Sequence, residues 1–384
     1  MNRTTSVLEP LSGAQRILGQ IGSSASGPTL LVCCGIHGNE PAGVLAVRRV
    51  FEKLGRDDRD LHGRFIAVAG NLAALEERRR FVDRDLNRMW LESDVERLSR
   101  TKQPTCSEEQ EMLELLAVIE QELEDDAGRV VFLDLHSTSA NGPPFCCLGD
   151  TLPNRTIAMA LGLPVILGLE ETIDGGLLEY LNNRGCRTVG VEGGQHDDPH
   201  TVDRLEAAIW ITLATAGLID EKTEPAVAAS RERLRRDTAG LPPVVEILHR
   251  HSITEADLFR MLPGFGSFQP IQAGEILARD RSGEIRSLLT GRVLLPLYQG
   301  QGNDGFFLGR DVRPFWLRLS RLLRRAHLQW LLRVMPGVQR HPTVEDALLV
   351  DPKIARFQVT NLFHLFGYRK CRPLGERLMF SRRR

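Results

Sequence analysis

The sequence contains no apolar run that approaches the ~20 residues a helix needs to cross a bilayer, which excludes an ordinary transmembrane helix. Its first residues, MNRTTSVLEPLSGAQRIL, also lack the continuous apolar stretch of a secretory signal peptide. No internal repeat and no low-complexity tract is present. We therefore expect a soluble, globular protein of the cytoplasm.

Cysteine is scarce and shows no pairing pattern. The chain has 7 cysteines, an odd number, and no two of them have CxxC spacing. This usage argues against a disulfide framework and predicts reduced thiols that are mostly buried as small hydrophobic side chains.

Net charge is close to zero, at -1, but it is unevenly distributed. Residues 313–384 carry 16 Lys and Arg against 4 Asp and Glu, whereas residues 1–312 carry 33 against 46. An acidic body followed by a basic tail indicates a domain boundary. At 384 residues and 42% hydrophobic content, the chain is long enough for two domains and an extension.

Short apolar runs alternate with helical patterns through the first half of the chain. The helical patterns cover 41–54, 107–123 and 202–216; the second opens on a Ser-x-x-Gln capping box, and Gly217 ends the third. This alternation predicts an α/β sheet with helices on both faces, in which ligands gather at the carboxyl ends of the strands. The apolar runs predicted as buried strands are TLLVCCG (29–35), RFIAVAGN (64–71), RVVFLDLHS (129–137), LPVILGL (163–169) and CRTVGVEGG (186–194).

Composition then divides the chain into four predicted parts. These are an α/β catalytic domain (1–219), a charged, Ala-rich linker (220–242), a small β domain (243–312) and a basic, partly helical extension (313–384). In the extension we expect one apolar and one basic helical face. The apolar face comprises Trp316, Leu319, Leu323 and Trp330, and the basic face Arg318, Arg321, Arg325 and Arg333.

His37 and Glu40 form an HxxE pair directly after a predicted strand, in GIHGNE. With 10 histidines and 50 acidic residues such a pair arises readily by chance. His200 and Asp203 form a similar pair, which we interpret as an exposed helix terminus. The first pair differs because a glycine-flanked turn at a strand end lets both side chains face one ligand.

A catalytic zinc needs three protein ligands and an open position for water. His136 follows another predicted strand and supplies the third candidate. Asp134, two residues earlier, either holds the ring of His136 in a metal-binding orientation or caps the loop.

Two further stretches offer groups that act on a substrate. Glu192 ends an apolar strand, where a lone carboxylate is costly unless it is paired or functional, and it is the candidate general base. The run RRRFVDRDLNRMW (78–90) contains Arg80, Asn87 and Arg88. An arginine-rich run is usually a solvated helix face, but arginine also recognises carboxylates and stabilises oxyanions.

Together the stretches GIHGNE, DRDLNR, DLHST and VEGG resemble the succinylglutamate desuccinylase and aspartoacylase family, a branch of the zinc carboxypeptidase fold. The resemblance covers about residues 30–217, and 243–312 is similar to the family's second domain more loosely. It implies a zinc-carboxypeptidase-like mixed sheet flanked by helices, followed by the small β domain and the basic extension. It also implies one zinc ion per chain held by His37, Glu40 and His136, with Glu192 as general acid/base, Arg80 polarising the carbonyl, and Asn87 and Arg88 holding the substrate carboxylate.

The sequence also departs from aspartoacylases proper. They carry an arginine about ten residues before the glutamate, where this chain has Asn182, with Arg184 and Arg187 nearby. This difference counts against N-acetylaspartate as the substrate. Tyr298 is either the counterpart of a tyrosine that the family's second domain lends to the site or a structural residue.

The leading hypothesis is a zinc-dependent hydrolase acting on a small anionic N-acyl amino acid or related amide. One alternative is a zinc carboxypeptidase acting on peptides. Another is a non-catalytic binding protein whose basic tail contacts a membrane surface or nucleic acid, of which nucleic acid is the less favoured partner. A simpler interpretation of the tail is a helix packed on the body or on a sister subunit in a homo-oligomer.

Overall fold

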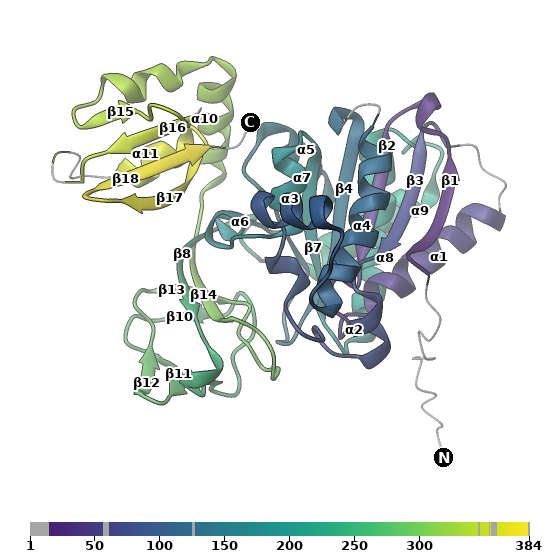
Figure 1. The fold of residues 1–384 in the computed structure, drawn as a ribbon, viewed down its shortest axis with the longest axis horizontal. Helices are drawn as coiled ribbons and strands as arrows, with labels where there is room; N and C mark the ends of the chain where they lie inside the picture. Colours follow the sequence, from purple (N-terminus) through teal and green to yellow (C-terminus); the bar gives the residue numbers. More distant parts are fainter. Residues whose placement is uncertain are drawn as a thin grey trace.

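The structure is a computed structural model that describes residues 15–56, 61–124, 127–344, 346–352, 354 and 359–382. One eleven-stranded mixed sheet runs through it in the order β1-β3-β2-β4-β7-β5-β6-β8-β14-β13-β10. A three-stranded sheet, β12-β11-β9, and a four-stranded sheet, β15-β16-β18-β17, form two smaller lobes beside it (Figure 1).

The predicted strands form the centre of the large sheet. β3, β2, β4 and β7 run parallel, β1 pairs antiparallel with β3 at one edge, and β5 pairs antiparallel with β7. Every residue of β2 is buried, as expected for a strand covered on both faces. The strands are β1 (Ile17–Gly22), β2 (Thr29–Cys34), β3 (Arg64–Ala69), β4 (Val130–Thr138), β5 (Phe145–Cys147), β6 (Val165–Leu167) and β7 (Arg187–Gln195).

Helices cover both faces of this sheet, as predicted. Successive residues of β2 point to opposite faces, so Leu30 and Val32 pack in one core and Leu31 and Cys33 in the other. The first core includes α1 (Ala42–Arg56), α5 (Leu152–Leu161), α8 (Pro199–Ala216) and α9 (Pro225–Asp237). The second includes α3 (Glu92–Thr101), α4 (Ser107–Leu123) and α7 (Leu177–Asn183), and the short helices are α2 (Leu72–Glu77), α6 (Leu169–Thr172), η1 (Ser24–Ser26), η2 (Leu86–Arg88) and η3 (Ala127–Arg129).

The predicted helix ends are mostly right, but the capping box at 107 is wrong. The N-cap of α4 is Cys106 and makes no side-chain cap bond, so Ser107 is already the first helical residue. The carboxylate of Asp83 accepts a hydrogen bond from the Ser107 backbone N–H at 2.8 Å instead. Gly217 does end α8, in the left-handed region at φ 87°.

The segment predicted as a linker, 220–242, contains the ordered helix α9, which packs against α8. The next element, β8, pairs with β6 on one side and β14 on the other. The large sheet therefore continues into residues 243–312, the predicted small β domain, which we call the second β region. The division into four domains stays a prediction. The elements of this region are β8 (Val244–Ser252), η4 (Glu255–Asp257), β9 (Arg260–Met261), β10 (Pro270–Ile271), β11 (Ile276–Asp280), β12 (Gly283–Arg286), β13 (Gly291–Leu294) and β14 (Asp304–Asp311).

The C-terminal extension has its own small core, built around Leu332, Phe363, Tyr368 and Phe380. The apolar helical face predicted there is wrong, because α10 ends at Arg325 and Trp330 lies in the separate 3-10 helix η5. The extension also contains a sheet that the sequence did not indicate. Its elements are α10 (Pro314–Arg325), η5 (Leu328–Val334), β15 (Val338–Arg340), β16 (Ala347–Val350), α11 (Val359–Leu365), β17 (Tyr368–Leu374) and β18 (Arg377–Arg382).

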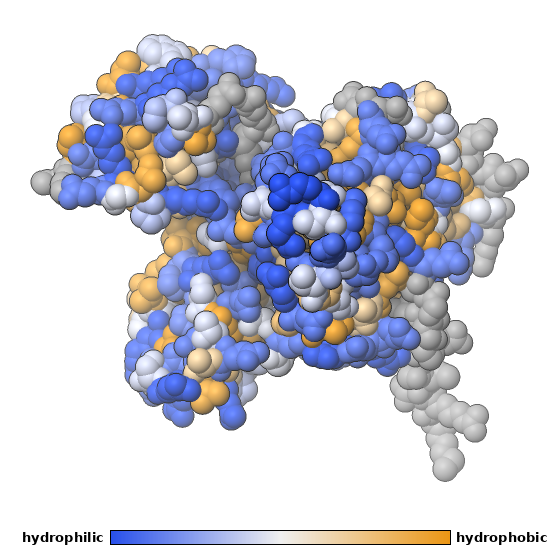
Figure 2. All heavy atoms as spheres, viewed as in Figure 1, coloured by the Kyte–Doolittle hydropathy of each residue, from blue (hydrophilic) through white to orange (hydrophobic). Residues whose placement is uncertain are grey.

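Cations of the extension pair with acids of the body. Arg369 contacts both Asp150 and Glu246, and Arg324 also contacts Asp150, at 3.2 Å. Part of the basic charge of the tail is therefore matched within the chain. Hydrophilic residues cover most of the face seen in Figure 2, with apolar residues scattered among them. No helix in the described part of the chain is long and apolar enough to span a membrane.

Candidate active site

Three neighbouring strands of the large sheet bring the predicted residues together. His37 and Glu40 lie in the turn after β2, His136 lies in β4, and Glu192 lies in β7 directly opposite His136. β4 and β7 run on to Thr138 and Gln195, so His136 and Glu192 are inside the ends of their strands rather than beyond them.

The glycine-flanked turn after β2 is tightly packed. Gly35 has a φ of 66°, in the left-handed region that favours glycine. A Cβ atom on Gly38 would lie 1.9 Å from the carbonyl carbon and oxygen of Ala74, so no side chain fits there. The turn can therefore lie against α2 and direct His37 and Glu40 to one point.

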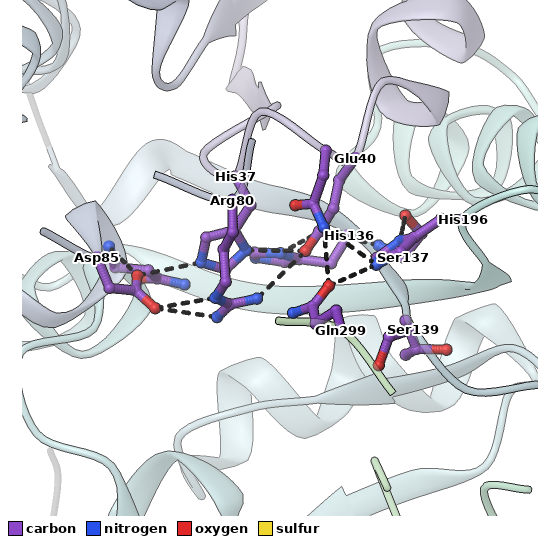
Figure 3. Close-up of polar contacts among 12 residues, drawn as sticks. His37, Glu40, Arg80, Asp85, His136, Ser137, Ser139, His196 and Gln299 are labelled. Carbon is purple, nitrogen blue, oxygen red and sulfur yellow. Dashed lines mark hydrogen bonds and ion pairs between the residues drawn. The ribbon is translucent and has the colours of Figure 1, made fainter. Parts of the chain in front are cut away.

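The three candidate metal ligands converge in a buried site (Figure 3). The Glu40 carboxylate bridges two imidazoles: Oε1 lies 2.9 Å from Nδ1 of His37, and Oε2 lies 3.1 Å from Nδ1 of His136. One ligand atom from each residue lies within 4.8 Å of the others, and the exposed fractions are only 3–8%.

Two further carboxylates fix the imidazole rings from behind. Nε2 of His37 lies 3.1 Å from Oδ1 of Asp85, and Nε2 of His136 lies 3.0 Å from Oδ2 of Asp134. A carboxylate on the far nitrogen leaves Nδ1 of each ring to act as the ligand atom. Donor set and backing carboxylates together fit a zinc ion. Asp134 lies beside the ring of His136, the position that the first of its two predicted roles requires, whereas the part played by Asp85 was missed.

Burial and charge act in opposition on the pKa values of this group. Burial alone would raise the pKa of Glu40, but the two histidines outweigh it and hold that pKa well below its usual range. Burial would lower the pKa of His136, yet Asp134 and Glu40 raise it well above the ordinary value. The carboxylates of Glu40 and Asp134 thus create a negative potential at this point, and a metal cation would take the place of the proton that the potential otherwise favours on His136.

Glu192 differs from Glu40 because burial dominates. Burial raises the pKa of Glu192 to about 8. Its Oε2 atom is buried and has no hydrogen-bond partner within the described ranges. A carboxyl group that is not fully paired and has a pKa near neutrality is suited to accepting and returning a proton.

Arg80 lies beside the ligand cluster and is fixed by Asp85. Its Nε and Nη2 atoms donate to Oδ2 of Asp85 at 3.2 and 3.0 Å, and Nη1 lies 3.6 Å from Oε1 of Glu40. Asp85 therefore orients both a candidate metal ligand and the candidate oxyanion-stabilising arginine, as Figure 3 shows.

Asn87 and Arg88 form the neighbouring wall. Oδ1 of Asn87 accepts a hydrogen bond from the Leu177 backbone N–H at 2.9 Å, which fixes the side-chain amide. Nη2 of Arg88 donates to Oδ2 of Asp304, at the start of β14, at 2.9 Å. This ion pair with the second β region could not be inferred from the motif.

A loop of the second β region, residues 295–303 between β13 and β14, lines the pocket on the side of His196. Gln299 accepts a hydrogen bond from Asn39 at 2.8 Å and lies 3.0 Å from Nε2 of His196, whose Nδ1 lies 2.8 Å from Oγ of Ser137. His196 and Gln299 were missed, because no pattern in the sequence links these distant segments. They form one hydrogen-bonded network beside the ligand cluster (Figure 3).

The resulting pocket is small, with a volume of about 130 Å³. All seven predicted site residues line it: His37, Glu40, Arg80, Asn87, Arg88, His136 and Glu192. Tyr298 does not; its hydroxyl donates to the Leu262 carbonyl at 2.7 Å and accepts from the Phe265 N–H, which is the structural alternative. Asn182, Arg184 and Arg187 are also absent from the lining.

Comparisons with known proteins relate the chain to one protein family. Residues 26–209 match the family model described as the Succinylglutamate desuccinylase/Aspartoacylase catalytic domain. Over 61 residues the chain is 44% identical to a succinylglutamate desuccinylase from Erwinia tasmaniensis, a match that spans 16% of this chain and 18% of the relative.

Solved structures with the same fold cover more of the chain. A succinylglutamate desuccinylase from Vibrio parahaemolyticus has a TM-score of 0.56 and 14% identity, covering 75% of this chain and 83% of that one. Murine aminoacylase 3 has a TM-score of 0.52 and 20% identity, covering 74% and 95%. At these identities the likeness establishes the fold.

Proposed function

Because residues 26–209 belong to the succinylglutamate desuccinylase/aspartoacylase family, we propose that this protein is a zinc-dependent hydrolase of a small N-acyl amino acid or related amide. The observation that carries the proposal is the convergence of His37, Glu40 and His136 beside Glu192 in one pocket. That grouping combines a candidate three-residue ligand set with a carboxylate whose Oε2 atom has no hydrogen-bond partner among the described residues.

The chain's own residues would divide the chemistry among them. Zinc held by His37, Glu40 and His136 would supply a Lewis acid that polarises a carbonyl and makes water more acidic. Glu192 accepts the proton of the attacking water and passes it to the departing amine. Arg80, held in place by Asp85, stabilises the negative charge that develops on the carbonyl oxygen.

The pocket also bears on the choice of substrate. At about 130 Å³ it is smaller than the ~300–1,000 Å³ typical of ligand pockets. Gln299 and its loop cover the side next to His196. This supports a small amide over a peptide, so the carboxypeptidase alternative is the weaker one.

The test is metal content measured together with activity. We would purify the native protein and Glu192→Gln, assay both for zinc, and follow amine release from a panel of N-acyl amino acids and short peptides. We expect about one zinc per chain in both proteins and turnover only in the native one. A native protein that binds no zinc when it is supplied, or a variant as active as the native enzyme, would refute the proposal.

A further inference from the structure

The charge of the pocket wall limits which substrates it can hold. Among the described residues that line the pocket, only Arg80 and Arg88 have lysine or arginine side chains. Both are already paired with carboxylates, Arg80 with Asp85 at 3.0 Å and Arg88 with Asp304 at 2.9 Å. Neither arginine therefore presents an uncompensated positive charge to the pocket.

Asp304 is firmly held in this position. Its side chain is 12% exposed and receives hydrogen bonds from two arginines, Arg88 and Arg250. Arg250 comes from β8, outside the pocket lining, and also donates to the Thr172 carbonyl at 2.8 Å. The second β region thus places a fixed negative charge against the arginine expected to hold the substrate carboxylate.

Arg88 nevertheless keeps a free donor at Nε. Its Nη2 donates to Asp304 and its Nη1 donates to the Asn87 carbonyl at 2.8 Å. Its Nε is buried and has no hydrogen-bond partner in the described part of the chain. One carboxylate placed beside Asn87 and Arg88 would satisfy this donor.

A second substrate carboxylate would meet no comparable partner. Beyond the ligand cluster and Glu192, the lining offers His196, whose two ring nitrogens already contact Ser137 and Gln299. It also offers the acidic side chain of Glu170, neutral polar groups such as Ser139, and apolar side chains such as Ile173. A carboxylate moved from water into such surroundings loses more hydration free energy than its new contacts in the pocket return.

We infer that the substrate carries a single carboxylate, with an uncharged acyl group and an uncharged side chain, and that Asp304 sets this specificity. The inference rests on the proposed function and narrows it. It separates this chain from an enzyme that removes a dicarboxylic acyl group, because such a substrate brings at least one further negative charge.

The experiment compares N-acetylglutamine, N-acetylglutamate and N-succinylglutamate. The first two have nearly the same shape and differ by one carboxylate, and the third adds another. For the native enzyme we expect kcat/KM to fall at least about tenfold from the first compound to the second, and further for the third. A native enzyme that prefers either of the more charged compounds overturns the inference.

Variants of Asp304 test the cause. Asp304→Asn should reduce the preference for N-acetylglutamine over N-acetylglutamate at least about threefold, because Arg88 then carries an uncompensated charge. Asp304→Glu should keep the native preference. Asp311→Asn is the matched control, since Asp311 lies on the same strand and pairs with Arg292 away from the pocket. An unchanged ratio in Asp304→Asn contradicts the role of Asp304.

Ligand-induced stabilisation gives an answer that does not need turnover. N-acetylglutamine should raise the melting temperature of the zinc-loaded native protein more than N-acetylglutamate does at equal ionic strength. If no compound of the wider panel is hydrolysed, the proposed function fails, and this comparison still decides the charge preference because it does not depend on turnover. A larger shift with N-acetylglutamate rejects the inference.

Discussion

At the scale of single residues, a carboxylate lies behind each of the two histidines of the candidate ligand set. Asp134 is fully buried, and Oδ2 lies 3.0 Å from Nε2 of His136. Asp134→Asn keeps the shape but removes the charge that favours the orientation of His136. We expect zinc affinity to fall about 10- to 100-fold, measured by competition with a chelator.

The control for this change is Asp197→Asn, an exposed acid in the loop after β7. It should leave zinc affinity unchanged. If Asp134→Asn binds zinc as tightly as the native protein, the carboxylate does not support the site.

The second prediction at this scale concerns the pH dependence of Glu192. Its pKa is raised to about 8 by burial, and the base must be deprotonated to act. We therefore expect kcat/KM to rise with pH, with the midpoint of the rise at or below about pH 8. The midpoint can lie below 8 because a bound cation favours the ionised carboxylate and so lowers the pKa of Glu192. A profile that stays flat as the pH falls well below neutrality would contradict this role.

At the scale of elements, the turn between β2 and α1 depends on its glycine. Gly38→Ala would place a Cβ 1.9 Å from the carbonyl group of Ala74, so the turn must move. We expect this variant to lose most of its zinc binding and to melt at a lower temperature than the native protein.

Gly55→Ala is the matched control for that experiment. Gly55 lies inside α1, and an added Cβ would meet no atom within 4 Å. Alanine is favoured over glycine in helices by about 0.5–1 kcal/mol, so this variant should be as stable as the native protein or more so. Equal zinc binding by both variants would show that the turn tolerates a side chain.

At the scale of the whole molecule, a buried ionic cluster joins the extension to the body. Asp150 is 1% exposed and contacts Arg155, Arg324 and Arg369. Asp150→Asn would leave three arginines short of their partner. We expect the free energy of unfolding to fall by about 3–5 kcal/mol, measured by denaturant titration. Glu232→Gln, which breaks an exposed pair with Arg235, should cause no measurable change.

The same cluster predicts how stability depends on pH. Burial alone would raise the pKa values of Asp150 and Glu246, but the arginines around both and His364 beside Glu246 hold them below the usual range. Because these pKa values are lower in the folded state, the stabilisation is complete above pH ~4 and is lost as pH falls below that. Denaturant titrations across this range should show a smaller loss for Asp150→Asn than for the native protein, and equal losses would contradict the prediction.

Local patterns were enough to predict most elements of the N-terminal half. The five apolar runs are strands, and 107–123 is a helix with the predicted bounds, because hydrophobic periodicity reports burial directly. The capping box failed because a tertiary contact, from Asp83 to the Ser107 N–H, satisfies the helix end instead. The helical face around Trp316 and Trp330 failed because the chain leaves α10 after Arg325, a turn that periodicity alone did not reveal.

The sequence by itself determined the strands of the site and predicted the candidate ligand set and the candidate base, because each of these depends on short motifs at the ends of apolar runs. Only the tertiary structure decided the surroundings: Asp85 behind His37, Gln299 beside His196 and Asp304 against Arg88. These contacts join segments separated by 48, 103 and 216 positions, and no local pattern records such pairings. The motifs therefore predict which residues would act, whereas the charge and size of the pocket depend on how the second β region packs against those residues.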